Sequence, residues 1–316
     1  MKRFLFLSMI VLASISLAIF LSSCELFVPE PENGTIRIIS IGIDYSNYGG
    51  SNKPSTLKGT VNDAKAISQA FLALAQAAVN LSEFSPESNI IEMLQEKGKV
   101  YTATDPSYPS KTNILDQLEI FKECDKNDIT VIYYSGHGDT DGSLLPAYSA
   151  TESNARISPE EMLEALVDIP GKKVLILDSC FSGNHIPHDE TTIDLQTSEN
   201  AWHDAFASLW EKETTISSDS LFVISAASTD KQSFEPGDEG HGFFTESILK
   251  GLGLVNEDTE DGETTYAFTT PPACNGNTLT IDGLFSYAVS EMPTEYVKLQ
   301  SPQLIRGLYD LVLFEF

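Results

Sequence analysis

The sequence predicts a three-layer α/β/α sandwich with a mostly parallel central sheet of about six strands. Short apolar runs alternate with amphipathic segments along the chain, and the apolar runs at residues 129–134 and 173–177 show no polar alternation. Strands of this kind are covered by helices on both faces, as in parallel sheets. Alternation of strands and helices favours parallel strands joined by crossover helices.

The first half of this sandwich is expected to hold two strand-helix pairs before the run at 129–134. A strand over residues 35–44 precedes a helix over 61–79, and a strand near 99–103 precedes a helix over 111–124. The first helix has apolar side chains at helical spacing on one face: Ala64, Ile67, Phe71 and Leu74. The second helix is expected to be capped by a polar residue at its start, Thr112 or Asn113.

The second half begins with a complete helix-start signal. Ser158 is followed by proline at the first helical position and by Glu161 three residues on, which predicts a helix to residue 167. A long polar inserted loop at about 184–220, with a helix at 200–210, follows the run at 173–177. The other expected elements are a strand over 220–226, helices over 242–252 and 282–289, and a strand near 308–314.

The N-terminus predicts export. Two basic residues precede an apolar stretch that ends in Leu21-Ser22-Ser23-Cys24, which is typical of a lipoprotein signal peptide over residues 1–23. Cleavage would leave Cys24 as the acylated first residue; an uncleaved anchor or an ordinary signal peptide is the alternative. Glu25 rather than aspartate after the cysteine favours the outer membrane or cell surface. Residues 24–34 are expected to form an extended tether, and residues 35–316 a single domain.

The formal net charge of −27 excludes nucleic acid as an expected partner, because phosphate backbones are bound by clustered Lys and Arg. It favours cationic substrates or bound cations, or serves solubility alone. Of the four cysteines, Cys124 and Cys274 have no assigned role. An exported protein permits a disulfide between them, and the sequence leaves that pairing open.

Two glycine-bearing turns carry the chemistry. Gly136-His137-Gly138 and Ser179-Cys180 each follow one of the two most apolar runs. Catalytic groups of open α/β sheets lie beyond the carboxyl ends of the strands, so an imidazole and a thiol are expected to meet there. Such a pair generates a nucleophile, because the imidazole takes the proton of the thiol. The alternative is a small buried Cys180 and a His137 that only completes a turn.

The two turns, in this order on successive strands, resemble those of the caspase-like cysteine peptidases (peptidase C14), and within them of bacterial metacaspase relatives. The resemblance extends from about residue 36 to the end of the chain. Further segments that resemble this family are Ile41-Gly42-Ile43-Asp44-Tyr45, Leu57-Lys58-Gly59-Thr60-Val61-Asn62-Asp63-Ala64, Ser225-Ala226-Ala227-Ser228-Thr229-Asp230, Gly242-Phe243-Phe244-Thr245 and Gln300-Ser301-Pro302-Gln303.

The resemblance implies a caspase-like fold and a cysteine endopeptidase that works through an acyl-enzyme. Cys180 would be the nucleophile and His137 the general base and then acid, with an oxyanion hole formed by the N–H groups of Gly138 and Cys180. It further implies protein or peptide substrates cleaved after Lys or Arg. No cofactor is required, and activation by Ca²⁺ is left open.

Asp63 and Asp178 match the acidic residues with which metacaspases bind the basic side chain. A carboxylate in a narrow pocket is what a guanidinium or ammonium group needs, since a buried charge must be paired. The alternatives are a helix-start charge for Asp63 and a strand-end cap for Asp178. True caspases, in contrast, cut after aspartate and need arginines in this pocket. None of the arginines of this chain is beside the catalytic turns in sequence: Arg3, Arg37, Arg156 and Arg306. Thr60 and Phe181 stand where some relatives carry cysteine and histidine.

The sequence also bears on self-cleavage, metal binding and alternative functions. Lys212 is the only basic residue between Lys173 and Lys231, so self-cleavage in the inserted loop is expected there. No metal site is predicted: His185 and His188 flank a proline in a polar loop, and the acidic run at 257–263 lacks EF-hand spacing and is expected to be a surface loop. Two other functions remain open, an inactive peptide-binding scaffold and a peptidase of gingipain or legumain type with different specificity.

Overall fold

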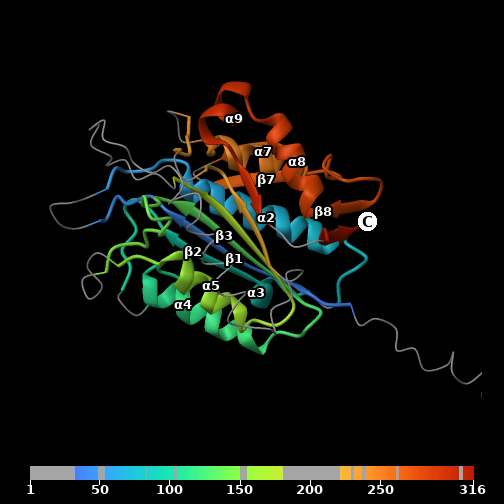
Figure 1. The fold of residues 1–316 in the computed structure, drawn as a ribbon, viewed down its shortest axis with the longest axis horizontal. Helices are drawn as coiled ribbons and strands as arrows, with labels where there is room; N and C mark the ends of the chain where they lie inside the picture. The colour runs from blue at the N-terminus through green and yellow to red at the C-terminus, as the bar shows by residue number, and fades with distance from the viewer. Residues whose placement is uncertain are drawn as a thin grey trace, which may run out of the picture. The chain divides into compact units, whose positions relative to one another are not determined.

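A six-stranded sheet forms the centre of the domain in the computed structural model (Figure 1), which describes residues 33–48, 54–82, 84–102, 105–149, 155–180, 221–228, 231–236, 240–260, 263–305 and 309–316. Residues from Gly34 onward belong to one structural unit. Several residues and segments named above lie outside the described residues: Cys24, Phe181, His185, His188, Lys212 and the helix expected at 200–210. No helix within these ranges is both long and apolar enough to cross a membrane.

The sheet is mostly parallel, as the sequence predicts. Its strand order is β2-β1-β3-β4-β5-β9, with the first five strands parallel and the last antiparallel to its neighbour. The strands are β1 (Ile36–Ile43), β2 (Ile90–Gln95), β3 (Ile129–Gly136), β4 (Lys172–Ser179), β5 (Leu221–Ser225) and β9 (Gln303–Ile305). Strands β3 and β4 lie at the centre and pair directly along their whole length.

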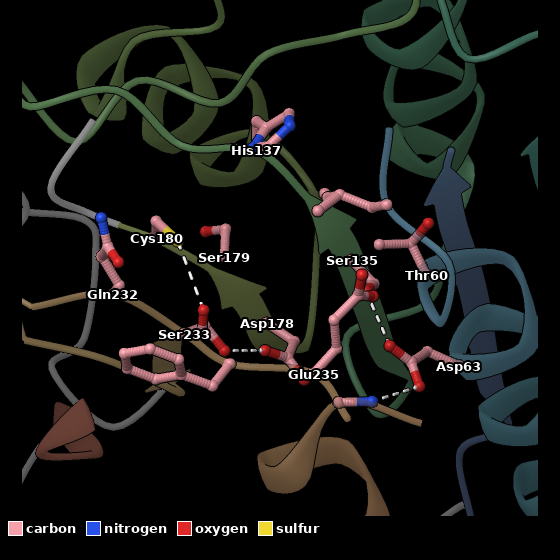
Figure 2. A pocket seen from close by; sticks show the side chains of 14 residues that line it. Thr60, Asp63, Ser135, His137, Asp178, Ser179, Cys180, Gln232, Ser233 and Glu235 are labelled. Atoms are coloured by element: carbon pink, nitrogen blue, oxygen red, sulfur yellow. Dashed lines mark hydrogen bonds between the residues drawn. The ribbon is translucent and has the colours of Figure 1, made fainter. Parts of the chain in front are cut away.

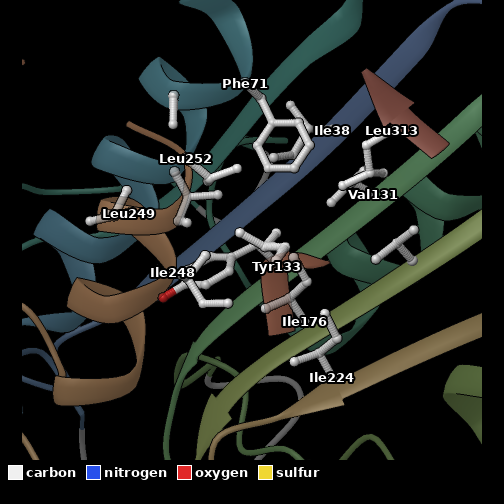
Figure 3. Close-up of a cluster of buried hydrophobic side chains, with 14 of the residues drawn as sticks. Ile38, Phe71, Val131, Tyr133, Ile176, Ile224, Ile248, Leu249, Leu252 and Leu313 are labelled. Atoms are coloured by element: carbon white, nitrogen blue, oxygen red, sulfur yellow. The ribbon is translucent and has the colours of Figure 1, made fainter. Parts of the chain in front are cut away.

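Helices cover both faces of this sheet (Figure 1). One face packs against α2 (Thr60–Ala77), α7 (Phe243–Gly251) and α8 (Ile281–Glu291), and the other against α4 (Lys111–Ile120) and α5 (Pro159–Val167). The strands alternate accordingly: Tyr133 and Ile176 face the first layer (Figure 3), whereas Tyr134 and Leu177 face the second. Both faces of β3 and β4 are therefore buried, which explains their unbroken apolar sequence.

Smaller elements complete the domain. A hairpin is formed by β6 (Leu254–Glu260) and β7 (Glu263–Phe268), and β8 (Thr278–Thr280) pairs with β10 (Val312–Glu315). The remaining elements are α3 (Pro86–Asn89), the 3₁₀ turn η2 (Phe121–Glu123) and α9 (Thr294–Gln300).

The helix-start signal at Ser158 is confirmed, because its side chain and that of Glu161 form a reciprocal capping box at the start of α5. Other local predictions are wrong. Ser110, rather than Thr112 or Asn113, caps α4 by accepting the Asn113 N–H. The second strand lies at 90–95, the chain then turns at Gly98 with φ of 79°, and the described residues 99–102 form no strand.

Two further expectations concern segments away from the sheet. The acidic run at 257–263, expected to be a loop, contributes to both strands of the β6–β7 hairpin. Cys124 and Cys274 are free thiols, so the disulfide left open by the sequence is not formed.

Candidate active site

The imidazole and the thiol predicted from the sequence lie at one edge of the sheet. Gly136 at the end of β3 pairs with Ser179 at the end of β4, so His137 and Cys180 each follow the last paired residue. Both line one pocket of about 100 Å³, here called the acidic pocket (Figure 2). The other residues that line it are Leu57, Thr60, Asp63, Ser135, Gly136, Asp178, Ser179, Gln232, Ser233, Phe234, Glu235 and Gly242.

The orientation of His137 is fixed from two sides. Its Nε2 lies 2.8 Å from the carbonyl oxygen of Ser55. A carbonyl only accepts hydrogen bonds, so Nε2 carries the proton and the lone pair of the neutral ring is on Nδ1. The Tyr45 ring packs against the imidazole at 4.6 Å between centroids, and the Tyr45 hydroxyl accepts the His137 backbone N–H at 2.8 Å.

Tyr45 itself has an uncommon backbone conformation, with φ of 57° in a fully buried residue. Non-glycine residues held there cost about 1 kcal/mol or more and persist where their surroundings determine them. Polar contacts hold Tyr45 in this conformation: its hydroxyl donates to the Leu145 carbonyl and lies 3.0 Å from the Tyr134 hydroxyl. The strain is therefore located directly behind His137.

The Cys180 thiol faces the loop after β5, where the Ser233 carbonyl accepts its S–H at 3.5 Å. Burial, together with the negative charges of Asp178 and Glu235, raises the pKa of the thiol to about 11. The thiol is therefore protonated at neutral pH in the unliganded protein. An attack by sulfur requires that a base removes this proton as the bond forms.

Gly138 approaches the residue after β4 closely. A Cβ built on it would lie 1.8 Å from the Cys180 carbonyl oxygen, closer than any side chain allows. The glycine turn after β3 and the cysteine turn after β4 therefore contact each other through backbone atoms alone. The oxyanion-hole role expected for the Gly138 N–H stays a prediction.

Asp178 forms the floor of the acidic pocket together with Asp63. Its Oδ1 accepts the Ser233 hydroxyl at 2.5 Å, and its Oδ2 accepts the hydroxyl and the backbone N–H of Thr245 at 2.5 and 3.2 Å. Burial, followed by the nearby charge of Asp63, raises the pKa of Asp178 to about 6. The carboxylate is therefore ionised at neutral pH but titrates close to it.

Asp63 lies in the first turn of α2 and is 1% exposed. Its Oδ2 accepts the Ser135 hydroxyl at 2.9 Å, and its Oδ1 lies 2.9 Å from His241 and accepts the Gly242 N–H at 3.2 Å. Burial raises the pKa of Asp63, against the effect of these partners. A Cβ on Gly242 would approach both pocket carboxylates, at 2.7 Å from Asp178 and 3.5 Å from Asp63, so only glycine leaves this space open.

Glu235 is a third carboxylate of the pocket that the sequence analysis did not single out. It reaches across from the loop after β5 and accepts the backbone N–H groups of Lys58 and Gly59 at the start of α2. His137 is the one lining residue with a basic side chain. Glu235 carries no motif of its own, so only the three-dimensional contact over 177 residues brings it to the pocket.

Four other residues that contact the site also come from distant parts of the sequence. Ser233 and Thr245 hold Asp178, and Ser55 and Tyr45 hold His137. A usable signal existed for Thr245 and Tyr45, which lie in segments that resemble the family, and none existed for Ser233 and Ser55. Within the described part of the chain, no group of three or more His, Cys, Asp or Glu side chains could hold a metal ion.

Comparison with known proteins decides the family. The sequence matches the Caspase domain family over residues 39–309. The chain belongs to the caspase-domain family. Members of this family are cysteine peptidases, and the match covers both catalytic turns, the pocket carboxylates and the hairpin. No curated protein matches the sequence significantly.

Solved structures with a similar fold are distant in sequence. A protein from Geobacter sulfurreducens is 13% identical, with a TM-score of 0.48, over 88% of this chain and 93% of its own. Caspase-1 from Spodoptera frugiperda is 10% identical, with a TM-score of 0.47, over 86% of both chains.

Proposed function

We propose that this caspase-domain protein is a cysteine endopeptidase that cleaves peptide bonds after Lys or Arg. The observation that carries the proposal is the content of one pocket, in which the thiol of Cys180 and the imidazole of His137 are accompanied by three carboxylates. A basic side chain that enters this pocket meets Asp63, Asp178 and Glu235. Charge-assisted hydrogen bonds of this kind are about twice as strong as neutral ones.

In the proposed reaction, the Cys180 sulfur attacks the carbonyl carbon of the scissile bond while Nδ1 of His137 takes the thiol proton. The backbone N–H groups of Gly138 and Cys180 bind the oxyanion that forms. His137 then gives its proton to the leaving amine, which leaves a thioester between the substrate and Cys180. Water, deprotonated by His137, releases the acid and restores the thiol. The Ser55 carbonyl stabilises the imidazolium by accepting its Nε2–H.

The N-terminal sequence supports anchoring of this peptidase by a lipid on Cys24, at the outer membrane or cell surface. Lys212 in the inserted loop is the proposed site of self-cleavage. Incorporation of labelled palmitate by wild type but not by Cys24→Ala tests the first proposal. Loss of processing in both Cys180→Ala and Lys212→Ala tests the second, and a Cys180→Ala chain that is still cut there would contradict it.

A panel of fluorogenic peptides ending in Arg, Lys, Asn or Asp tests the central proposal, run with and without calcium. Wild type should hydrolyse the Arg and Lys peptides, and Cys180→Ala should hydrolyse none. Preference for Asn would favour the legumain type instead. A lack of hydrolysis of all four peptides, with and without calcium, would favour the inactive scaffold.

A further inference from the structure

A buried histidine lies directly behind the acidic pocket and has no part in the proposed reaction. His241 precedes α7 and is 6% exposed. Its Nδ1 lies 2.9 Å from Oδ1 of Asp63, and its Nε2 lies 2.9 Å from Oε2 of Glu257 on strand β6. The ring therefore bridges a carboxylate of the pocket and a carboxylate of the β6–β7 hairpin.

The hydrogen-bond partners of His241 favour a charged ring. Asp63 already accepts the Ser135 hydroxyl and the Gly242 N–H, and Glu257 is a second carboxylate on the other side of the ring. Between two ionised carboxylates, which only accept hydrogen bonds, both ring nitrogens donate and the ring is an imidazolium. Among the residues that the structure describes, Tyr266 of β7 packs at 6.4 Å between ring centroids, and Asp178 lies beyond Gly242. Hydrogen bonds and charges of the two carboxylates raise the pKa of His241, although burial alone would lower it.

The charged ring affects the ionisation of the pocket carboxylates when no substrate is present. Asp63 and Asp178 are both buried beside Gly242, and two such carboxylates without a nearby cation tend to share a proton. A fixed imidazolium against Oδ1 of Asp63 stabilises its ionised form. It also fixes the rotation of the carboxylate, whose Oδ2 remains bonded to Ser135 on the pocket side.

We propose that His241, held by Glu257, is a positioning residue that determines specificity by keeping Asp63 ionised and oriented to receive the basic side chain of the substrate. The proposal rests on the proposed function and deepens it. It makes the hairpin part of the specificity apparatus, because one of its carboxylates completes the bridge. A merely structural role would need His241 only to tie the hairpin to the sheet.

Kinetics separate the two roles. In His241→Gln and Glu257→Gln, KM for an Arg peptide should rise about tenfold or more with little change in kcat, because the substrate cation loses an ionised partner. The acidic limit of kcat/KM should move to higher pH, since Asp63 would then be protonated more readily. Asp258→Asn is the matched control, because Asp258 is on the same strand and bonds Asn256 instead. Lower thermal stability with unchanged KM and pH profile would overturn the proposal.

A second measurement does not depend on catalysis. In ¹⁵N-labelled Cys180→Ala protein, the His241 ring signals, assigned by their loss in His241→Gln, should show two protonated nitrogens at neutral pH. Agmatine, a guanidinium compound, should shift these signals, and the shift should be absent in Cys180→Ala/Asp63→Asn. A neutral ring, or no response to agmatine, would overturn the role of His241. If both NMR results are as expected but the wild type shows no peptidase activity, the proposed reaction alone would be contradicted.

Discussion

Replacing Asp178 by asparagine should strongly reduce cleavage after basic residues and at the same time stabilise the fold at neutral pH. The carboxylate is 6% exposed, and its pKa is about 6 in place of the ordinary 3.8. This difference corresponds to about 3 kcal/mol of unfavourable free energy whenever the folded protein must hold the ionised form. An amide is neutral at every pH, and its oxygen can still accept the Thr245 hydroxyl that Asp178 accepts now.

The sign of the pH dependence follows from the direction of the shift. A carboxyl group with a raised pKa binds its proton more tightly in the folded state, so its contribution to stability is present at low pH and lost as the pH rises through about 6. Wild type should therefore lose about 2 kcal/mol of unfolding free energy from this group between about pH 4.5 and about pH 7.5. Asp178→Asn should not show this loss, as urea unfolding at the two pH values would measure.

The peptidase activity of Asp178→Asn should fall although its stability at neutral pH rises. At neutral pH the variant takes away one of the two buried carboxylates of the pocket and leaves Asp63. Loss of a buried charge partner costs about 2–5 kcal/mol, or at least roughly 30-fold in kcat/KM. Asp168→Asn, at the exposed end of an ion pair with Lys122, should change neither quantity. The reasoning would be refuted by a variant that cleaves Arg peptides like wild type, or by one whose stability depends on pH as wild type does.

Three further outcomes are expected. Glu235→Gln should lower kcat/KM for Arg peptides about tenfold, because the substrate cation loses one charged partner. Glu246→Gln, which loses only a surface pair with Lys250, should leave kcat/KM unchanged. Equal effects of the two variants would contradict a pocket role for Glu235. Gly138→Ala should reduce kcat about 100-fold or more, because its Cβ would displace the Cys180 carbonyl; a fully active variant would contradict that contact. The rate at which iodoacetamide alkylates Cys180, measured by mass spectrometry, should rise about tenfold per pH unit above neutrality. The reason is that the pKa of the thiol is about 11, so the thiolate fraction grows with pH. A plateau of the rate below pH 8 would contradict a protonated thiol.

The central strands were predictable because their sequence leaves few alternatives. Strands β3 and β4 are buried on both faces, and a long apolar run without periodicity fits that environment. The turns that follow them could be placed at the same sheet edge by the rule for parallel strands. Local chemistry sufficed for the start of α5, where Ser158 and its partner three residues on satisfy each other.

Segments stabilised by distant partners were not predictable in the same way. Strand β2 is an edge strand that buries only its second half, so its pattern did not distinguish it from the segment near residue 100. The acidic run at 257–263 is typical of a surface loop, yet its described residues pair in the β6–β7 hairpin. Glu257 and His241 acquire their roles only through contacts with each other and with Asp63, which is 178 residues from His241 in the chain.

The charges of the acidic pocket act on two quantities at once. In the proposed function Asp63, Asp178 and Glu235 attract a basic side chain. Asp178 and Glu235 also raise the pKa of the neighbouring Cys180 thiol and so lower its reactivity in the empty protein. A guanidinium or ammonium group in the pocket would offset these charges, which lowers the thiol pKa and eases transfer of its proton to His137. The arrangement therefore couples occupation of the pocket to activation of the nucleophile. A peptidase built this way would react slowly with small electrophiles and quickly with bonds that follow a basic residue.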